Sequence, residues 1–307
     1  MTTFLGSNQY GKAENRVVRI YRETDRHEIR DLNVSTSLRG DFDEAHTTGD
    51  QAKILPTDTQ KNTAFAYAKE HGVTSPEDYA IALGTHFLDA APAATAAQIR
   101  VEEYVWDRIT VDGSEHDHSF VRRGTETRTS VVTVEGRGDD QKVAVLAGLT
   151  DLVVLKSTGS EFKGYLKDGY TTLQETDDRV MATSLTARWR YDLDTIEDVD
   201  GFDWDGTYES IRSILLAAFA RTHSRALQET LFVMGDDALK AHPEVAEIRF
   251  AAPNKHHFLY DLSPFGTENN GEVFMAADRP YGLIEATVTR DDASDPGSAW
   301  TAVPAFV

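Results

Sequence analysis

The chain has 307 residues, of which 40% are hydrophobic and 27% charged, and it carries a formal net charge of −20 and no cysteine. This composition is typical of a globular protein with room for one large or two ordinary domains, and no apolar run reaches the ~20 residues that cross a bilayer. The acidic charge makes nucleic acid an unfavourable partner, and the lack of cysteine excludes disulfides, thiolate metal sites and cysteine nucleophiles.

The N-terminal region predicts a strand followed by two helices. The strand runs from Arg16 to Arg22. Thr57 and Gln60 have the spacing of a capping box at the start of the first helix. Ser75 and Pro76 fit the N-cap and the first position of the second helix.

Two strands are predicted after these helices. The first is long and alternating, and one of its faces carries Ile99, Val101, Val105, Ile109 and Val111. A turn at Asp112-Gly113 separates it from a strand through Val131 and Val134. A Gly/Asp-rich stretch from Gly136 to Gln141 then predicts a domain boundary.

The second half predicts the same order of elements. Its strands and helices are expected at Leu152–Lys156, Ser184–Tyr191, Trp204–Phe219 (helix), Ser224–Leu239 (helix), Val245–Phe250, Phe258–Leu262, Glu272–Met275 and Leu283–Val288. Runs of strands, then helices, then strands favour an α+β fold of antiparallel sheets with helices on one face. We expect a first domain in residues 1–140, a second in 141–290, and a flexible tail or lid in 291–307.

Metal and nucleotide signatures are weak. The only close histidine pairs are His116-x-His118 and His256-His257, and no HExxH motif occurs. Gly136-Arg137-Gly138 is a turn rather than a phosphate-binding loop, since neither GxGxxG nor GxxxxGK[ST] is present. We therefore expect no metal and no cofactor.

Several polar and aromatic residues have a structural and a functional interpretation. Thr57 is a helix cap, or it lies at a helix N-terminus that holds an anion, where the neighbouring Asp58 would offer its main-chain N–H. Lys12 is an exposed lysine, or a desolvated base beside a threonine. Gln228 is solvated helix surface, or its amide reads the donor and acceptor edges of a ligand.

Arg179 and Phe162 have the same ambiguity. Arg179 forms a surface ion pair with Asp177 or Asp178, or its planar fork binds a flat anion. Phe162 is a core aromatic, or it stacks on a flat ring.

Short motifs over nearly the whole length, in this order and spacing, resemble the cofactor-free urate oxidases, or uricases. They are Tyr10-Gly11-Lys12, Thr57-Asp58-Thr59-Gln60-Lys61-Asn62-Thr63, Leu83-Gly84-Thr85-His86-Phe87, His118-Ser119-Phe120, Leu155-Lys156-Ser157-Thr158-Gly159-Ser160-Glu161-Phe162, Asp178-Arg179 and Pro253-Asn254-Lys255-His256. The resemblance implies two tandem tunnelling-fold domains and a homotetramer whose subunits together close a barrel around a tunnel. It also implies oxidation of urate by dioxygen and water to 5-hydroxyisourate and hydrogen peroxide in purine degradation.

The resemblance also assigns roles. It implies that Lys12 and Thr57 form a catalytic dyad and that His256 completes a proton relay. The residues implied to bind urate and dioxygen are Thr57, Asp58, Phe162, Arg179, Leu227, Gln228 and Asn254. In the family Thr57 and Asp58 come from a neighbouring subunit, so each site would lie at an interface.

Two features bear on location. The first seven residues lack a basic flank and a long apolar core, so we expect no signal peptide. The chain ends at Pro304-Ala305-Phe306-Val307 without a peroxisomal Ser-Lys-Leu, which favours a bacterial cytoplasmic protein.

Two alternatives stay open at this point. One is another tunnelling-fold enzyme that acts on a pterin, for which the His/Cys zinc ligands are lacking. The other is a purine-binding protein without catalysis, against which Lys12, Thr57 and His256 argue.

Overall fold

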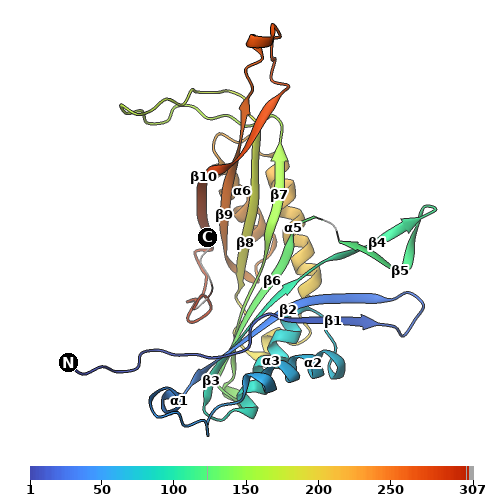
Figure 1. The fold of residues 1–307 in the computed structure, drawn as a ribbon, viewed down its shortest axis with the longest axis vertical. Helices are drawn as coiled ribbons and strands as arrows, with labels where there is room; N and C mark the ends of the chain where they lie inside the picture. Colours follow the sequence, from blue (N-terminus) through green and yellow to red (C-terminus); the bar gives the residue numbers. More distant parts are fainter. Residues whose placement is uncertain (123, 302, 304–307) are drawn as a thin grey trace.

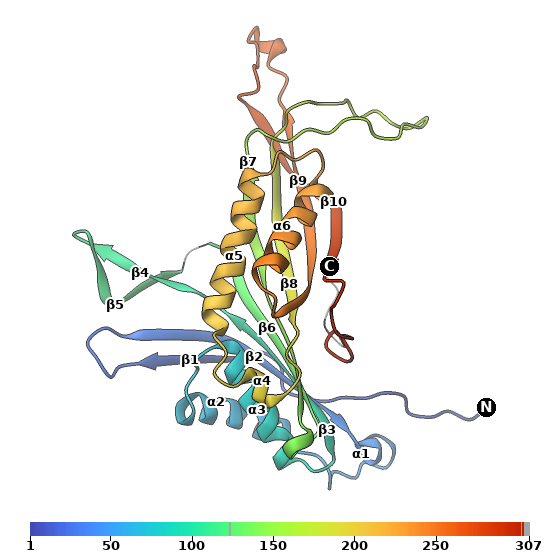
Figure 2. The same cartoon turned by 180° about the vertical axis from the view of Figure 1, so that it is seen from behind.

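The computed structural model describes residues 1–122, 124–301 and 303. Eight strands form one antiparallel sheet in the order β1-β2-β3-β6-β7-β8-β9-β10, and β4 and β5 form a separate two-stranded sheet. The longer helices cover one face of the large sheet (Figures 1 and 2). The fold is therefore α+β as predicted, and the sheet closes into no barrel within the described part of this single chain.

The first half contributes four strands to the large sheet. Its elements are β1 (Asn15–Tyr21), β2 (Glu28–Gly40), α1 (Asp43–Thr47), α2 (Thr57–Glu70), α3 (Pro76–Ala90), β3 (Ala94–Glu103), β4 (Trp106–Val111), β5 (Ser114–Arg122) and β6 (Thr127–Glu135). The sequence reasoning missed β2 and β5.

The second half contributes the other four strands. Its elements are η1 (Gly138–Asp140), β7 (Lys142–Lys156), β8 (Met181–Tyr191), α4 (Ile196–Val199), α5 (Trp204–Arg221), α6 (Leu227–Ala241), β9 (Val245–Leu259), η2 (Ser263–Phe265) and β10 (Phe274–Thr289). The predicted boundary falls at η1, where β6 pairs with β7 and the sheet continues without a break. The division into two domains stays a prediction.

The repeat of element order extends to packing. In α3, a Cβ added to Gly84 would lie 2.6 Å from a methyl of Val134 on β6. In α6, a Cβ added to Gly235 would lie 2.6 Å from a methyl of Val288 on β10. In each half the second long helix approaches the sheet so closely that only glycine fits at the contact.

The predicted alternating strand from residue 99 to 111 is wrong, because the chain breaks it into β3 and β4. Ile99 and Val101 are fully buried under the helices, whereas Val105, Ile109 and Val111 are 46%, 38% and 49% exposed. β4 instead pairs with β5 across the turn at Asp112-Gly113. The alternation of apolar residues continued, but the face that they occupy is not buried.

The strand pairs predicted at the C-terminal end are also wrong in their boundaries. The segments 245–250 and 258–262 fall in or beside the single strand β9, and the segments 272–275 and 283–288 in or beside β10. Pro253 did not end the strand. It lies opposite Leu283, beside a shift of register between Ala277 and Gly282.

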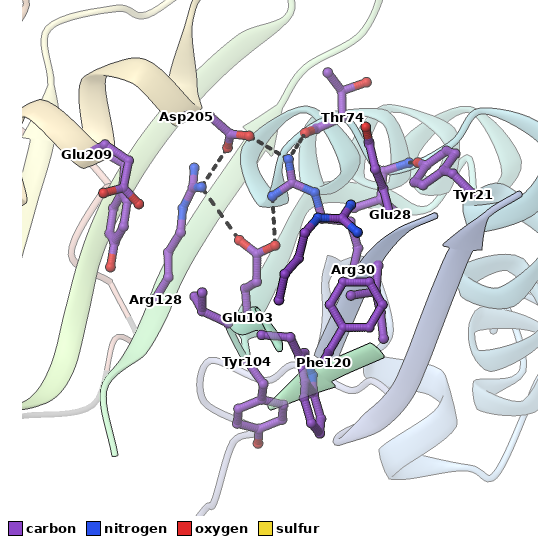
Figure 3. Close-up of a pocket in the computed structure, with 16 residues that line it drawn as sticks. Tyr21, Glu28, Arg30, Thr74, Glu103, Tyr104, Phe120, Arg128, Asp205 and Glu209 are labelled. Atoms are coloured by element: carbon purple, nitrogen blue, oxygen red, sulfur yellow. Dashed lines mark hydrogen bonds and ion pairs between the residues drawn. The ribbon is translucent and has the colours of Figure 1, made fainter. Parts of the chain in front are cut away.

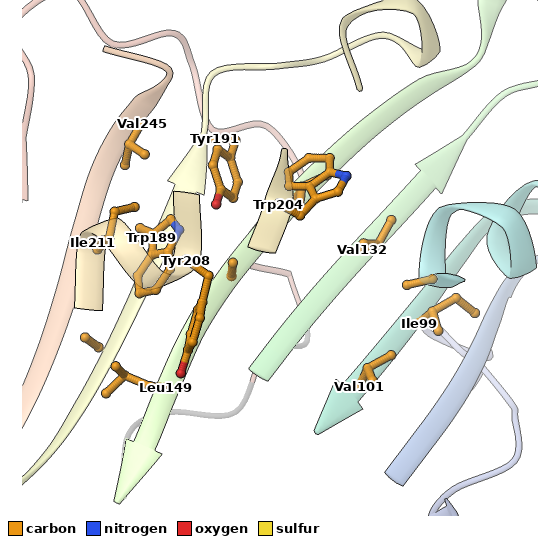
Figure 4. Close-up of a cluster of buried hydrophobic side chains, with 14 of the residues drawn as sticks. Ile99, Val101, Val132, Leu149, Trp189, Tyr191, Trp204, Tyr208, Ile211 and Val245 are labelled. Carbon is orange, nitrogen blue, oxygen red and sulfur yellow. The ribbon is translucent and has the colours of Figure 1, made fainter. Parts of the chain in front are cut away.

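Aromatic residues join α5 to the sheet (Figure 4). Trp189 and Tyr191 on β8 lie against Tyr208 and Trp204, with ring centroids 5.9 and 5.0 Å apart. All four side chains are at most 2% exposed, and each contributes roughly 1.5–3 kcal/mol by burial. The Trp204 indole N–H donates to Asp78 in α3 at 2.8 Å, so this core also links the two halves.

The C-terminal segment packs against the sheet. The Trp300 ring lies 3.7 Å below the Arg249 guanidinium and its N–H donates to Glu247 at 2.8 Å. The Gln98 amide donates to the carbonyl of Thr301 at 2.9 Å. We therefore revise the expected flexible tail or lid to a docked arm in residues 291–301 and 303. Pro304–Val307, on which the targeting prediction rests, lie outside the described residues.

Candidate active site

Six of the predicted site residues line one cavity of about 330 Å³. They are Phe162, Arg179, Leu227, Gln228, Asn254 and His256. They come from the loop between β7 and β8, the start of α6 and the middle of β9, which lie together in the upper part of Figure 1. A cavity of this size suits a small organic ligand.

The Arg179 guanidinium faces the cavity with its terminal nitrogens available. Its Nε donates to the Ser160 hydroxyl at 3.1 Å, and the group lies 5.2 Å from the Phe162 ring centroid. Among the described residues it forms no ion pair. Asp177 pairs with Lys163, and Asp178 accepts from the Thr158 hydroxyl at 2.9 Å. The surface ion-pair interpretation of Arg179 is therefore wrong.

Burial lowers the pKa of the Arg179 guanidinium below its ordinary value. An arginine in a protein nevertheless stays protonated at neutral pH. A charged and partly dehydrated fork is therefore ready to bind a planar anion through two parallel hydrogen bonds.

Phe162 lies at the cavity rather than in the core. Its side chain is half-buried and its ring stacks on Tyr165, with centroids 5.0 Å apart and planes within 15°. Its backbone exchanges two hydrogen bonds with Thr176, at 2.9 and 3.1 Å, which close the loop that follows β7. The core interpretation of Phe162 is therefore wrong, and its position suits stacking on a flat ligand.

The start of α6 presents helix N–H groups to the cavity. The N-cap residue Ala226 has no side chain that can accept a hydrogen bond, Leu227 is the first helical residue and Gln228 the second. Within the described part of the chain we find no partner for the Leu227 N–H. An uncapped helix N-terminus attracts negative charge. Gln228 is exposed, as its structural interpretation predicted, but it borders this cavity.

Asn254 and His256 occupy alternate positions of β9 and therefore share one face of the strand. The His256 ring stacks on Phe258, with centroids 5.6 Å apart. Opposite them β10 shifts register between Ala277 and Gly282. Such a bulge re-aims side chains beside a site.

Other cavity residues did not stand out in the sequence. They are Leu173, Gln174, Thr176, Val180, Gly282 and Ile284. The alternation of Gly282 and Ile284 along β10 is a signal that could have placed both on one face. The loop residues carry no comparable local signal.

Lys12, Thr57 and Asp58 gather at a different place, which we call the α2 corner. The Lys12 carbonyl accepts from the Thr36 N–H at 2.8 Å, and the Thr36 hydroxyl donates to the buried Gln60 amide in α2 at 2.7 Å. This chain of bonds ties the segment at Lys12, just before β1, to the first turn of α2, which begins at Thr57.

The predicted capping box at Thr57 is wrong. Thr57 is the first residue inside α2, the N-cap position is Pro56, and no side chain caps the helix. Gln60 is fully buried and bonds to Thr36 and to the Leu55 carbonyl instead. Among the described residues we find no hydrogen bond of the Thr57 hydroxyl, so this group is available to a ligand.

The Asp58 carboxylate is held by its own helix. It accepts from Asn62 at 3.0 Å and pairs with Lys61. Lys61, with a smaller contribution from Lys12, lowers the pKa of Asp58. The carboxylate is thus occupied, and the main-chain N–H of Asp58 is the group left to bind a ligand.

The α2 corner and the cavity do not meet within one chain. None of Lys12, Thr57 and Asp58 lines the cavity. In both ribbon views α2 lies beside α3 at the lower end of the molecule, whereas α6 and β9 lie above it (Figures 1 and 2). The nine predicted site residues therefore form two separate groups.

A larger cavity, of about 560 Å³, lies between the two halves, but its charges satisfy one another. Arg30 and Arg128 bond to Glu103 and Asp205 along its wall (Figure 3). Behind them Arg128 pairs with the fully buried Glu77 at 2.7 Å. Because Arg128 is on β6 and Asp205 on α5, this network links the halves.

Replacing Glu77 by glutamine is expected to flatten the dependence of stability on pH. Burial raises the pKa of Glu77 to about 7, above its ordinary 4.5. The folded protein therefore holds this proton more tightly than the unfolded chain, and stability that is present below pH 4.5 is lost as the pH rises through 7. The loss is of the order of 3 kcal/mol. Thermal unfolding between pH 5 and 8 measures it.

Glu209→Gln is the matched control, because Glu209 borders the same cavity but is exposed and outside the network. It should keep the wild-type dependence on pH. The same slope in Glu77→Gln and wild type would contradict the assignment of the proton to Glu77.

Among the described residues no three His, Asp or Glu side chains gather in a way that could hold a metal ion. His116 and His118 lie with ring centroids 4.5 Å apart. None of the described helices is long and apolar enough to cross a membrane.

Comparison with known proteins gives one answer. The family model described as Uricase matches residues 8–133 and 145–285. The chain is 50% identical over 302 residues to a uricase from Arthrobacter globiformis, covering 98% of this chain and 95% of that protein. It is 37% identical to a uricase from Schizosaccharomyces pombe, covering 94% and 99%. A crystal structure of uricase from Arthrobacter globiformis superposes with a TM-score of 0.88 over 96% of this chain and 98% of that chain.

Proposed function

Because the chain belongs to the uricase family, it oxidises urate, and we propose that it does so through a Lys12–Thr57–His256 proton relay without a cofactor. The reaction is urate + O2 + H2O giving 5-hydroxyisourate and hydrogen peroxide. Family membership sets aside the pterin enzyme and the purine-binding protein without catalysis.

The observation that carries the proposal is the available guanidinium at one side of the cavity and the uncapped helix start among its other lining groups. Arg179 would bind one polar edge of the urate anion, and Gln228 with the Leu227 N–H would bind the other. Phe162 would stack on the ring face. These contacts fix a flat anion in one orientation.

The remaining residues would act above the ring. Asn254, together with Thr57, would hold dioxygen and later the attacking water. Lys12 would take a proton through the Thr57 hydroxyl, and His256 would complete the relay. Deprotonated urate is electron-rich and reduces dioxygen itself, so the protein has only to move protons, orient the reactants and exclude water.

Separation of the α2 corner from the cavity within one chain supports a site shared between two copies. We propose a homotetramer in which Thr57, Asp58 and Lys12 of one subunit face the cavity of its neighbour. The sheet edges at β1 and β10 would then pair or be covered in the assembly, as exposed edges require.

Dissociation of the assembly is expected to abolish activity, because each chain would then hold only half of a site. Specific activity and molecular mass should fall together when the protein is diluted, with light scattering and urate turnover measured on the same samples. A monomer as active per chain as the assembly would overturn the shared site.

The reaction itself is tested by mixing metal-stripped protein with urate in air. Loss of the urate ultraviolet band should match peroxide formation one to one, with no effect of chelator. Turnover that chelator abolishes and added metal restores would refute the cofactor-free proposal.

The location in a bacterial cytoplasm also remains a proposal. Its support is the Arthrobacter relative and the lack of cysteine, which a reducing compartment allows. Recovery of the protein in the membrane or secreted fraction of its source cells would contradict it.

A further inference from the structure

We propose that Ser160 is a positioning residue for urate binding that acts through Arg179, holding its guanidinium at a fixed place relative to the start of α6. The proposal rests on the proposed function of the cavity, and it goes beyond it by naming what holds the two polar sides of the site at a fixed separation.

The Ser160 hydroxyl makes the only side-chain hydrogen bond found for Arg179 in the described residues, from Nε at 3.1 Å. Ser160 is fully buried, and its carbonyl accepts from the Arg179 N–H at 2.8 Å. Arg179 is thus held at its backbone and at Nε by one residue. This leaves both terminal nitrogens of the guanidinium for the ligand.

The direction of the hydrogen bonds fixes Ser160 as an acceptor. The Ser160 hydroxyl donates its single proton to the Met181 sulfur, with 3.6 Å between oxygen and sulfur. The oxygen lone pairs are therefore left to accept from Arg179. Met181 is 1% exposed and belongs to β8. The serine orientation is therefore set by the sheet and does not depend on solvent.

The same buried group reaches the start of α6. The Ser224 hydroxyl lies 3.4 Å from the Met181 sulfur and 2.9 Å from the Ala226 carbonyl, and it accepts from Thr230 in α6 at 2.8 Å. The backbone around Ser160 also pairs with the backbone around Ser224. The Glu161 N–H donates to the Ser224 carbonyl at 2.8 Å, and the Ser224 N–H donates to the Gly159 carbonyl at 2.9 Å.

These contacts make one rigid unit of the Arg179 side and the Leu227–Gln228 side. Both are fixed to Met181, so the distance between them is set inside the protein rather than by the ligand. A site of fixed width selects a flat ring of one size. Because its side chains are already ordered, binding the ligand costs less conformational entropy.

Ser160→Ala tests the proposal. It should raise KM for urate and the dissociation constant of xanthine by about tenfold each, since a bond to a charged group is lost, while kcat changes less than threefold. In an Arg179→Gln background the same change should have almost no further effect, because the residue through which Ser160 acts is gone. Ser160→Thr keeps the hydroxyl and should restore wild-type KM.

Ser224→Ala is the matched control. It also removes a buried hydroxyl beside Met181, but Ser224 does not contact Arg179, so its effect should be equal with arginine or glutamine at position 179. If Ser160→Ala does not fold, Ser160→Cys, which keeps the volume with a weaker acceptor, takes its place in the cycle.

An unchanged KM in the Ser160 variant, or an equal effect in both backgrounds, would overturn the proposal. Xanthine binding, measured by calorimetry, reads the positioning role without turnover. Wild-type protein that binds xanthine but does not oxidise urate would therefore count against the proposed function and leave this inference standing.

Discussion

Lys12→Met and Thr57→Ala are each expected to lower kcat for urate oxidation by about 10²- to 10⁴-fold, the usual contribution of a positioned acid–base group. The affinity for xanthine should stay within a few-fold of wild type, because the side chains proposed to grip the ring lie in the cavity and neither substitution changes them. Steady-state turnover and calorimetric binding measure the two effects separately.

Lys61→Met is the matched control for Lys12. Lys61 lies on α2 close to the corner, but its ammonium pairs with Asp58 and faces its own helix. This variant should keep kcat within a few-fold of wild type. Full turnover in both Lys12→Met and Thr57→Ala would contradict the proposed catalytic role of Lys12 and Thr57.

Arg179→Gln is expected to raise KM for urate by about 100-fold or more, since two charge-assisted hydrogen bonds to the substrate anion are lost. Arg179→Lys keeps the charge without the planar fork and should fall between this variant and wild type. Xanthine titration should show the same order of affinities as the urate KM.

Arg221→Gln serves as the control for Arg179. Arg221 is exposed at the end of α5 and pairs with Asp237. It should leave KM for urate unchanged. A similar KM in Arg179→Gln and Arg221→Gln would mean that the guanidinium in the cavity does not bind the substrate.

Periodicity predicted the fold class and most of the long elements, because β8, α5 and α6 bury the faces that their apolar residues mark. Periodicity failed where an apolar, alternating face is not buried. Ile109 and Val111 continue the alternation of β3 but lie on an exposed hairpin. Whether an apolar face is covered depends on distant parts of the chain, and a local pattern carries no such information.

The local hydrogen-bond partners of the candidate site residues were predicted poorly from the sequence. Thr57 and Gln60 have the spacing of a capping box, yet a tertiary contact with Thr36 takes the Gln60 side chain away from the helix end. Arg179 follows two aspartates, yet these bond to Lys163 and Thr158. In both cases the residues nearby in sequence were expected to be hydrogen-bond or ion-pair partners, but in the folded chain they bond to residues far away in sequence.

Gathering of six predicted residues around one cavity could be anticipated only from the resemblance to the family. Ser160 and Arg179 are 19 residues apart and Arg179 and Gln228 lie on different elements, so no spacing rule connects them. The separation of the α2 corner from the cavity could not be derived from the residues at all, because no local pattern shows how far apart two segments lie in the folded chain.

Subunit complementation tests the shared site most directly. Co-expressing the variants Lys12→Met and Arg179→Gln, with turnover assayed at a urate concentration far below the KM of Arg179→Gln so that both parents are nearly inactive, should produce mixed assemblies in which some sites combine an intact α2 corner with an intact cavity. With random mixing we expect activity of about a quarter of wild type, because each site needs an unchanged half from both chains. Mixed assemblies that stay as inactive as either parent would show that Lys12 and Arg179 act within one chain, and would contradict the account.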